Sequence, residues 1–322
     1  MPVSSDTRPV WSIASFTRRQ VVLASELTGA EARAYDQFVA TAPSGHYSQT
    51  RAWARVIAAE RSVEPLFFLV RYGDEVIGAG LVLRPVVGGV ALPVARIEHG
   101  PVTAAPEDLP EVLAALRQNC LSKGILRLAV SPNWTDPHRL VAESALSNAG
   151  FTPRSRADGR LRRSRRLDLA ALNEKKTWCA SNLVEIRRAI GTAARAGVTV
   201  RPGKHEDLAT LSDLAGLSLA ATAALDDYFL RPGAAMFVSS FHDTLISAVF
   251  SIIHKGLATS IRAFTTSRAL PFSPSVLAVT EAMQWARRMG AWAFEEQGGS
   301  SPEFAGYCRT EVLLVGEHVR WW

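Results

Sequence analysis

The sequence has 322 residues, 48% of them hydrophobic and 20% charged, a balance that is typical of a globular protein with room for two domains. No apolar run reaches membrane-spanning length, and Cys120, Cys179 and Cys308 share no metal-ligand spacing, so we expect a cytoplasmic protein with no metal site and no disulfide framework. The net charge of +6 and the pI near 9.5 permit a polyanionic partner without selecting one.

The first half of the chain predicts a mixture of helices and hairpin strands. After a flexible segment at 1–20, apolar residues at helical spacing predict a helix at 31–40 and a second helix that Ser48 or Thr50 caps. The pattern then predicts strands at 66–71, 76–83 and 90–97, a helix that ends at 122, a strand at 125–130 and a helix at 138–149.

A strongly basic segment opens the second half. Seven arginines lie between Arg154 and Arg166, and Asp158 is the only acidic residue among them. Such a run either forms a solvated linker or contacts an anion, and the residues alone leave both interpretations open.

The remaining chain again mixes helices and strands. The pattern predicts helices at 181–196, 206–224 and 232–241, strands at 245–254 and 257–264, a helix from 276 to 288, a strand at 291–294 and a last strand at 311–319. The strand at 291–294 ends in Glu295, Glu296, Gln297, Gly298 and Gly299, where polar side chains and bare backbone emerge together. We therefore predict an α/β fold of the mixed α+β kind.

Two stretches that lie 166 residues apart share one plan. Around Gly124 and around Gly290, a helix with basic residues is followed by a glycine, an apolar strand and a polar exit. Each stretch follows a predicted hairpin, so the sequence predicts two copies of one domain type.

Few local motifs indicate a reaction. Arg188, Gly191 and Ala193 fit the R-x-x-G-x-A loop that holds the coenzyme A pyrophosphate in GNAT acetyltransferases, but they lie inside a predicted helix. The sequence has no G-x-S-x-G elbow and no Walker or Rossmann glycine pattern. What remains is a group-transfer site that works by positioning and charge stabilisation.

Several stretches in the same order resemble the FemAB/FemX-like family of aminoacyl-tRNA-dependent peptidyltransferases. The segment from Ser48 to Trp53 is similar to the family's early "QS..W" helix, and His99-Gly100-Pro101 is similar to its "RGP" strand end. The entry into the second half, at 167–169 and 185–198, resembles "DLS … R..I.KA.K.GV", and 286–299 resembles "A...G...YDLGG". Asp227-Tyr228-Phe229 falls where members carry an aromatic pair.

The resemblance implies two tandem GNAT-like domains, the first at 21–155 on the acceptor side and the second at 156–322 on the donor side, with a C-terminal strand that packs back on the first. It implies transfer of an amino acid from charged tRNA, as co-substrate and without another cofactor, to an amine of a peptide-like or nucleotide-linked acceptor. The expected settings are peptide-antibiotic biosynthesis or a peptidoglycan precursor.

The resemblance also assigns site residues. The acceptor would contact Arg55, Arg96, His99 and Tyr228. The tRNA would contact Arg162, Arg163, Arg165, Arg166, Arg187, Arg188 and Arg195. Gln297, Gly298 and Gly299 would form the channel loop, and Glu296, Tyr307 and Arg309 would act in catalysis.

The sequence departs from the family at the expected reactive channel. Tyr307 and Cys308 stand where members carry a Phe-Lys pair, and Arg309 supplies a positive charge one residue later. This departure favours an acceptor other than the usual nucleotide-linked cell-wall precursor. An acyl-CoA-dependent N-acyltransferase and a non-catalytic binding protein on the same fold are the alternatives.

Overall fold

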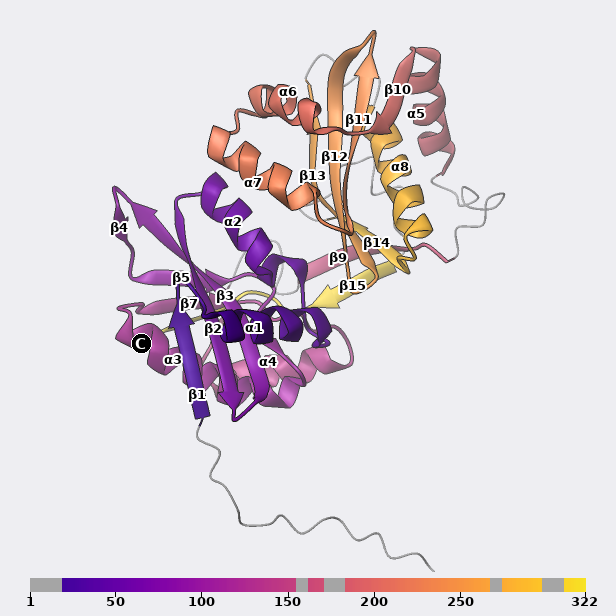
Figure 1. Cartoon of the computed structure of the whole chain (residues 1–322). Coiled ribbons are helices and arrows are strands. Elements are labelled where there is room, and N and C mark those ends of the chain that lie inside the picture. Colours follow the sequence, from indigo (N-terminus) through magenta and orange to yellow (C-terminus); the bar gives the residue numbers. More distant parts are fainter. Residues whose placement is uncertain (1–18, 155–161, 171–182, 267–273, 297–309) are drawn as a thin grey trace, which may run out of the picture.

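Two mixed β-sheets, each covered by helices on both faces, make up the described part of the chain (Figure 1). The structure is a computed structural model, and it describes residues 19–154, 162–170, 183–266, 274–296 and 310–322. The mixed α/β fold that the sequence predicts is therefore confirmed.

The first sheet has the strand order β1-β2-β3-β5-β7-β16-β8, with β4 and β6 paired to β3. Its strands are β1 (Arg19–Ala24), β2 (Val63–Tyr72), β3 (Glu75–Val87), β4 (Val90–Ala91), β5 (Val94–Ile97), β6 (Val102–Thr103), β7 (Arg127–Val130), β8 (Thr152–Pro153) and β16 (His318–Trp321). The predicted hairpin is present as β2 and β3, and β5 and β7 run parallel.

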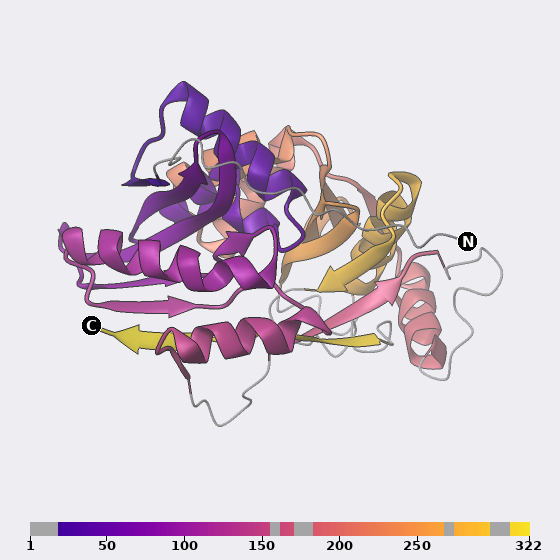
Figure 2. The same ribbon diagram turned by 90° about the horizontal axis from the view of Figure 1, so that it is seen from below.

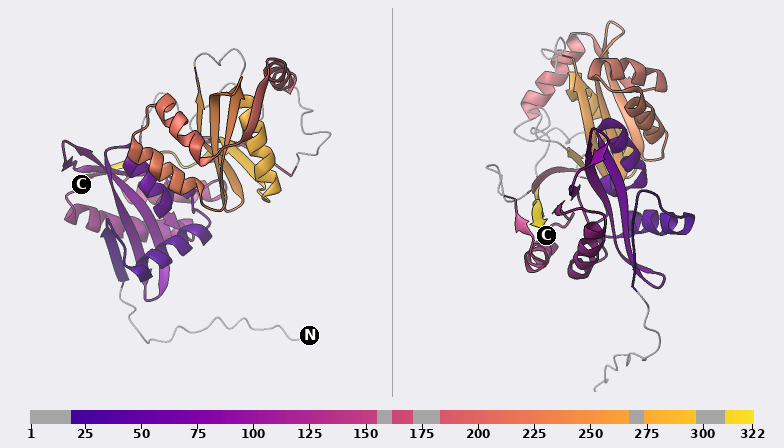
Figure 3. Two further views of the ribbon diagram at one scale, coloured as in Figure 1. Left: turned by 45° about the horizontal axis from the view of Figure 1, so that its top comes forward. Right: turned by 90° about the vertical axis from the view of Figure 1, so that its left-hand side faces the viewer.

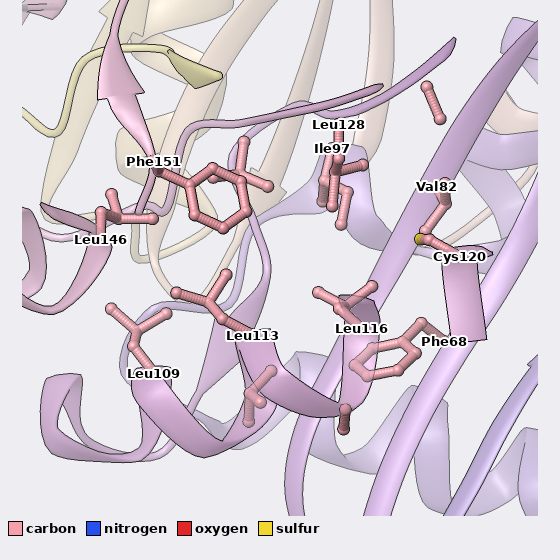
Figure 4. Close-up of a cluster of buried hydrophobic side chains, with 14 of the residues drawn as sticks. Phe68, Val82, Ile97, Leu109, Leu113, Leu116, Cys120, Leu128, Leu146 and Phe151 are labelled. Carbon is pink, nitrogen blue, oxygen red and sulfur yellow. The ribbon is translucent and has the colours of Figure 1, made fainter. Parts of the chain in front are cut away.

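Helices cover the first sheet because its central strands are apolar on both faces. The helices are α1 (Gly29–Thr41), α2 (Arg51–Glu60), α3 (Leu109–Ser122) and α4 (His138–Asn148), with short 3-10 turns at Tyr47–Gln49 and Pro106–Asp108. Alternation along β2 turns Phe68 and Val70 towards α3, and Phe67 and Leu69 towards α1 and α2. Figure 4 shows the α3 side, where Phe68 packs with Leu113 and Leu116.

The second sheet has the strand order β10-β11-β12-β13-β14-β9-β15. Its strands are β9 (Arg162–Asp168), β10 (Val198–Pro202), β11 (Ala234–Phe241), β12 (Thr244–His254), β13 (Leu257–Thr265), β14 (Ala293–Glu296) and β15 (Thr310–Leu314). Its helices are α5 (Leu183–Arg195), α6 (His205–Ala215), α7 (Leu219–Phe229) and α8 (Pro274–Arg288). Phe237 and Val249 pack against α8, whereas Val238 and Phe250 face α6.

The internal repeat is visible in the topology. Helix α3, Gly124 and strand β7 in the first sheet match α8, Gly290 and β14 in the second. Both glycines have positive φ, 70° and 81°, as a left-handed helix cap requires. Each repeat ends in a strand that runs parallel to its neighbour, β5 with β7 and β13 with β14.

The chain crosses between the two sheets after β8 and again after β15. Strand β9 follows the first sheet in the sequence but lies in the second, between β14 and β15, and the C-terminal strand β16 returns to the first sheet between β7 and β8. Figure 2 shows the yellow C-terminal strand beside the magenta part of the molecule. The chain therefore passes between the sheets twice, and the first sheet contains a strand from the C-terminal end of the sequence.

Two predicted helices were wrong. The helix predicted at 206–224 is split into α6 and α7, because Gly216 has a φ of 65° and Ser218 caps the start of α7. The helix predicted at 232–241 is strand β11, which pairs on both sides, with β10 and with β12.

Two predicted strands are each divided. The strand predicted at 90–97 breaks into β4 and β5 at Leu92 and Pro93, and the one predicted at 311–319 breaks into β15 and β16, which enter different sheets. The arginine-rich segment is not only a linker, since its second part forms β9.

The two domains share a hydrophobic interface. Helix α2 of the first domain packs against α7 of the second, and the two lie side by side in both views of Figure 3. The rings of Trp53 and Tyr228 meet edge to face at 5.5 Å, and Leu225 and Ile252 belong to the same buried cluster. This contact fixes the position of a cavity between the domains.

Candidate functional site

The strand pairing of the second sheet is interrupted where its two parallel strands, β13 and β14, end. The described ladder between β13 and β14 stops at Ser260 and Glu296, while β13 continues to Thr265. At the same level, Ile261 is an extra residue in the ladder between β13 and β12. A bulge interrupts pairing and redirects backbone N–H groups. The carboxyl ends of these parallel strands are thus a place where backbone can meet a ligand.

A buried carboxylate, that of Glu295, lies beside the ends of these two strands. Strand pairing places Glu295 of β14 between Thr259 of β13 and Arg166 of β9. Ser164, two residues before Arg166 and thus on the same face, donates its hydroxyl hydrogen bond to Glu295 Oε1, and Arg166 Nε lies 3.5 Å from that oxygen. The Arg166 guanidinium also stands 6.0 Å from the Trp292 ring. These contacts hold Arg166 within the sheet.

In the first domain, the corresponding strand end holds a histidine cluster. The rings of His46 and His99 stack at 3.7 Å, and the Ser48 hydroxyl lies 2.8 Å from His46 Nδ1 and 3.2 Å from His99 Nδ1. All three residues are buried. Gly100 is required here, because a Cβ would lie 2.7 Å from Ile97. The cluster therefore closes this strand end with packed, hydrogen-bonded side chains.

A cavity of about 840 Å³ lies between the domains. Its first-domain wall comes from α1, α2 and the segment around Glu26, and its second-domain wall comes from the end of α7 and from β12. Tyr47, Phe67 and Tyr228 give it aromatic surface, and its ionisable residues are Glu26, Asp36, Arg51, Arg55, Arg231 and His254. Its volume is in the range of small-ligand sites.

Ion pairs order the arginines of this cavity. Arg51 donates from Nε to Asp36 Oδ1 at 2.9 Å and from Nη2 to Asp36 Oδ2. Arg55 Nη1 lies 3.3 Å from Asp227 Oδ2, which joins α2 to α7. Burial lowers the pKa of His254 to about 4, so its imidazole is neutral near pH 7.

Comparison with known proteins identifies this architecture. No family model matches the sequence, and no curated protein matches it. Among solved structures, FemX is similar with a TM-score of 0.70 and 14% identity over 94% of this chain and 97% of that one. The chain has the FemX fold.

Two further structures share this arrangement. A tandem GNAT protein from the clavulanic acid biosynthesis pathway is similar with a TM-score of 0.58 and 13% identity, over 94% of this chain and 98% of that one. The C-terminal domain of a putative lysylphosphatidylglycerol synthetase from Agrobacterium fabrum has a TM-score of 0.54 and 15% identity, over 90% of this chain and 91% of that one. The chain thus shares its fold with a tandem GNAT protein, as the sequence resemblance implies.

Within the FemX fold, the predicted acceptor residues separate into two groups. Arg55 and Tyr228 line the interdomain cavity. Arg96 and His99 are not among its lining residues: Arg96 Nη2 pairs with Glu98 Oε1 at 3.0 Å, and His99 belongs to the histidine cluster. The cavity therefore contains half of the predicted acceptor set.

The predicted tRNA-binding arginines are also divided. Arg163 and Arg165 alternate with Ser164 and Arg166 along β9 and are exposed, whereas only 15% of the Arg166 side chain is accessible. Arg188 and Arg195 are exposed on α5. Arg162 is the first residue of β9, and Arg187 lies within α5. Arg166 thus differs from the rest by its position inside the sheet.

The predicted catalytic group falls largely outside the described residues. Glu296 is the last residue of β14. Gln297, Gly298, Gly299, Tyr307 and Arg309 lie outside the described ranges, and their assigned roles stay predictions.

The coenzyme A motif has an unsuitable setting in the FemX fold. Arg188, Gly191 and Ala193 lie within α5 and not at its start, where backbone N–H groups are available. The N-terminus of α3, which follows β5 in the first domain, carries Asp108 and Glu111, whose charges disfavour a pyrophosphate. Neither helix provides a typical pyrophosphate site.

Within the described residues, no three His, Cys, Asp or Glu side chains are grouped as a metal site would require. No helix in the same part of the chain is long and apolar enough to span a membrane.

Sequence reasoning missed several residues of this site. Arg51, Arg231 and His254 line the cavity but come from α2, the segment after α7 and β12. Arg51 lies within the motif from Ser48 to Trp53, so the sequence could have indicated it as a site residue. Arg231 and His254 stand in no motif, so only the docking of the domains identifies them.

Proposed function

We propose that this protein is an aminoacyltransferase, which moves an amino acid from aminoacyl-tRNA to an amine of a peptide-like acceptor without the ribosome. The observation that supports it is the interdomain cavity, lined by Arg55 and Tyr228, in a chain that shares its fold with FemX along nearly its whole length. Peptide-antibiotic biosynthesis and modification of a peptidoglycan precursor are the two proposed settings.

The proposed reaction exchanges an ester for an amide. The neutral acceptor amine attacks the carbonyl carbon of the aminoacyl ester, and the carbonyl oxygen becomes an oxyanion. The carbon–oxygen bond to the tRNA then breaks, and the ribose hydroxyl leaves with the proton that the amine releases. Backbone N–H groups at the bulge around Ile261 are suited to stabilise such an oxyanion, and Glu296, Tyr307 and Arg309 are the proposed side-chain participants.

The donor tRNA is proposed to bind exposed arginines of the second domain. Arg163, Arg165, Arg188 and Arg195 are exposed there. Phosphate contacts of this kind give affinity that is independent of sequence and decreases with salt. Arg166 is better suited to position Glu295 than to contact a phosphate, because it is already paired within the sheet.

The test combines a transfer assay with a binding assay. Purified protein is incubated with tRNA charged with radiolabelled amino acids and with short peptides, and products that survive alkaline hydrolysis of the ester are identified by mass spectrometry. We expect an amide product and salt-sensitive tRNA binding, with R163A/R165A lowering the slope of log K against log salt by about 0.9 for each lost phosphate contact. Exposed Arg33 of the first domain supplies the control, R33A. Binding of tRNA that does not respond to salt would contradict the proposal.

The second candidate is an acyl-CoA-dependent N-acyltransferase. It is favoured by the similarity to the tandem GNAT protein from the clavulanic acid biosynthesis pathway. The position of Arg188, Gly191 and Ala193 within α5 and the acidic N-terminus of α3 argue against it. Thermal-shift measurements with acetyl-CoA separate the candidates, because a tightly bound cofactor raises the melting temperature in a concentration-dependent way.

A further inference from the structure

The charges around the interdomain cavity nearly cancel. Its guanidinium groups belong to Arg51, Arg55 and Arg231. Asp36 binds Arg51 through both carboxylate oxygens, and Asp227 pairs with Arg55. Glu26 supplies a third carboxylate to the wall that Arg231 shares. Within the described residues, carboxylates therefore engage two of these three guanidinium groups, and the positive charge that remains for a ligand is that of Arg231.

A nucleotide diphosphate needs more unengaged positive charge than one guanidinium group supplies. Its phosphates carry at least two negative charges, which proteins usually meet with several unengaged donors or cations. In this cavity, a diphosphate would compete with Asp36 for Arg51 and with Asp227 for Arg55, and each displaced carboxylate would stay nearby as a like charge. His254 adds no cation near pH 7, because it is neutral there.

We propose that the cavity binds a zwitterionic, peptide-like amine and rejects nucleotide diphosphates. This inference rests on the proposed function, because it names the acceptor class of the same transfer reaction. Glu26 offers negative charge to an ammonium group, and Arg231 offers a guanidinium to a carboxylate.

The uncharged part of the cavity lining is suited to the side chains of a peptide. Tyr47, Phe67 and Tyr228 present aromatic surface, and Ile252 and Pro232 add aliphatic surface. Burial raises the pKa of the Tyr228 hydroxyl, which therefore stays protonated and can donate a hydrogen bond. A volume of about 840 Å³ accommodates a peptide of a few residues.

Two probes test the proposal by isothermal titration calorimetry, without tRNA. Uridine diphosphate represents the nucleotide class, and a pool of tripeptides with free termini represents the zwitterionic class. We expect tripeptides to bind and R231A to weaken them about tenfold, as for the loss of a charged hydrogen bond. Uridine diphosphate is expected not to bind at about 1 mM, a level that corresponds to about 4 kcal/mol.

A gain of function provides the sharper measurement. The variant D36N/D227N releases Arg51 and Arg55, so it is expected to bind uridine diphosphate at least about tenfold more tightly than the wild type. The control D74N/D213N makes the same change in net charge at exposed residues that do not line the cavity and is expected to leave binding unchanged. The side chains of Asp36 and Asp227 are 46% and 60% exposed, so their removal should preserve folding, which circular dichroism checks.

Three results would overturn the inference: wild-type affinity for uridine diphosphate tighter than about 100 μM, no gain in D36N/D227N, or no bound tripeptide. These results are separate from the fate of the proposed function. If aminoacyl transfer fails while the two binding results hold, the donor assignment is wrong and the acceptor class stands.

Discussion

Glu295 and Arg166 form an ion pair that is almost removed from solvent. Their side chains are 6% and 15% exposed, and Ser164 adds a hydrogen bond to the carboxylate. Breaking a buried pair leaves one charge without compensation, which costs more than the intact pair contributes. We therefore expect E295Q to lower the free energy of unfolding by about 3 kcal/mol, measured by urea denaturation.

The neighbouring pair on the same strand is the control. Arg163 lies 3.3 Å from Glu311, but their side chains are 64% and 45% exposed. Exposed pairs contribute little, so E311Q should change the unfolding free energy by less than about 1 kcal/mol. Equal losses in E295Q and E311Q would show that burial does not distinguish the two pairs.

These two pairs also show what a sequence can reveal about single residues. A run of arginines predicts repulsion or an anion, and the exposed Arg163 and Arg165 agree with that general expectation. Arg166 looks identical in the sequence, yet a carboxylate 129 positions later is its partner. Only the ladder between β9 and β14 brings the two together, and no local pattern encodes that ladder.

At the scale of elements, the sequence was most reliable where the pattern was local. The hairpin of β2 and β3, a helix capped by Ser48 or Thr50, and the glycines Gly124 and Gly290 between helix and strand were predicted from neighbouring residues. Thr50 is the cap that α2 uses. Strand β11 was predicted as a helix because eight apolar and small residues after Pro232 and Gly233 fit either period. Its partners β10 and β12 decide the outcome, and they lie outside any sequence window.

The turn between β12 and β13 connects the domains at the level of elements. Lys255 Nζ donates hydrogen bonds to the carbonyl oxygens of Ala42 and Pro43 at the end of α1, the second at 3.0 Å. His254, the last residue of β12, lies in the cavity wall next to this contact. Burial lowers its pKa from 6.5 to about 4.

That shift predicts a dependence of stability on pH. Below pH 6.5 the unfolded chain binds a proton at His254 that the folded chain does not bind until about pH 4, so stability falls as the pH drops across this window. Above pH 6.5, His254 does not lower the free energy of unfolding. At pH 4, its protonation in the unfolded chain lowers that free energy by about 3 kcal/mol. Urea denaturation of the wild type and of H254Q at several pH values measures it.

The variant H254Q separates His254 from other titrating groups. Asp207 loses its stabilising charge only below its ordinary pKa of 3.8, because the hydrogen bond from Arg201 lowers its pKa, so it contributes little above pH 4. The wild type should therefore lose more stability than H254Q between pH 6.5 and 4. Parallel curves would mean that His254 has the same pKa in the folded and the unfolded protein.

At the scale of the whole molecule, the return of the last strand to the first sheet makes the domains depend on each other. Strand β16 lies between β7 and β8, and the following Trp322 donates its indole N–H to the carbonyl oxygen of Ile125 at 2.9 Å. Strand β9 occupies the same kind of internal position in the second sheet. The internal repeat predicted two domains, but repeats carry no information about which sheet receives a terminal strand.

This dependence predicts that damage to the last strand spreads to the second domain. Val319 is buried at the centre of β16, so V319D places a charge in the core and should cost more than about 3 kcal/mol. The control W321A changes a residue of the same strand that is 68% exposed and should cost about 1 kcal/mol or less. Because the Trp53–Tyr228 cluster and the returning strand β16 couple the sheets, hydrogen exchange in V319D should lose protection in β11 to β13 as well as in β2 and β3. Loss confined to β2 and β3 would show instead that the second sheet unfolds independently of the first.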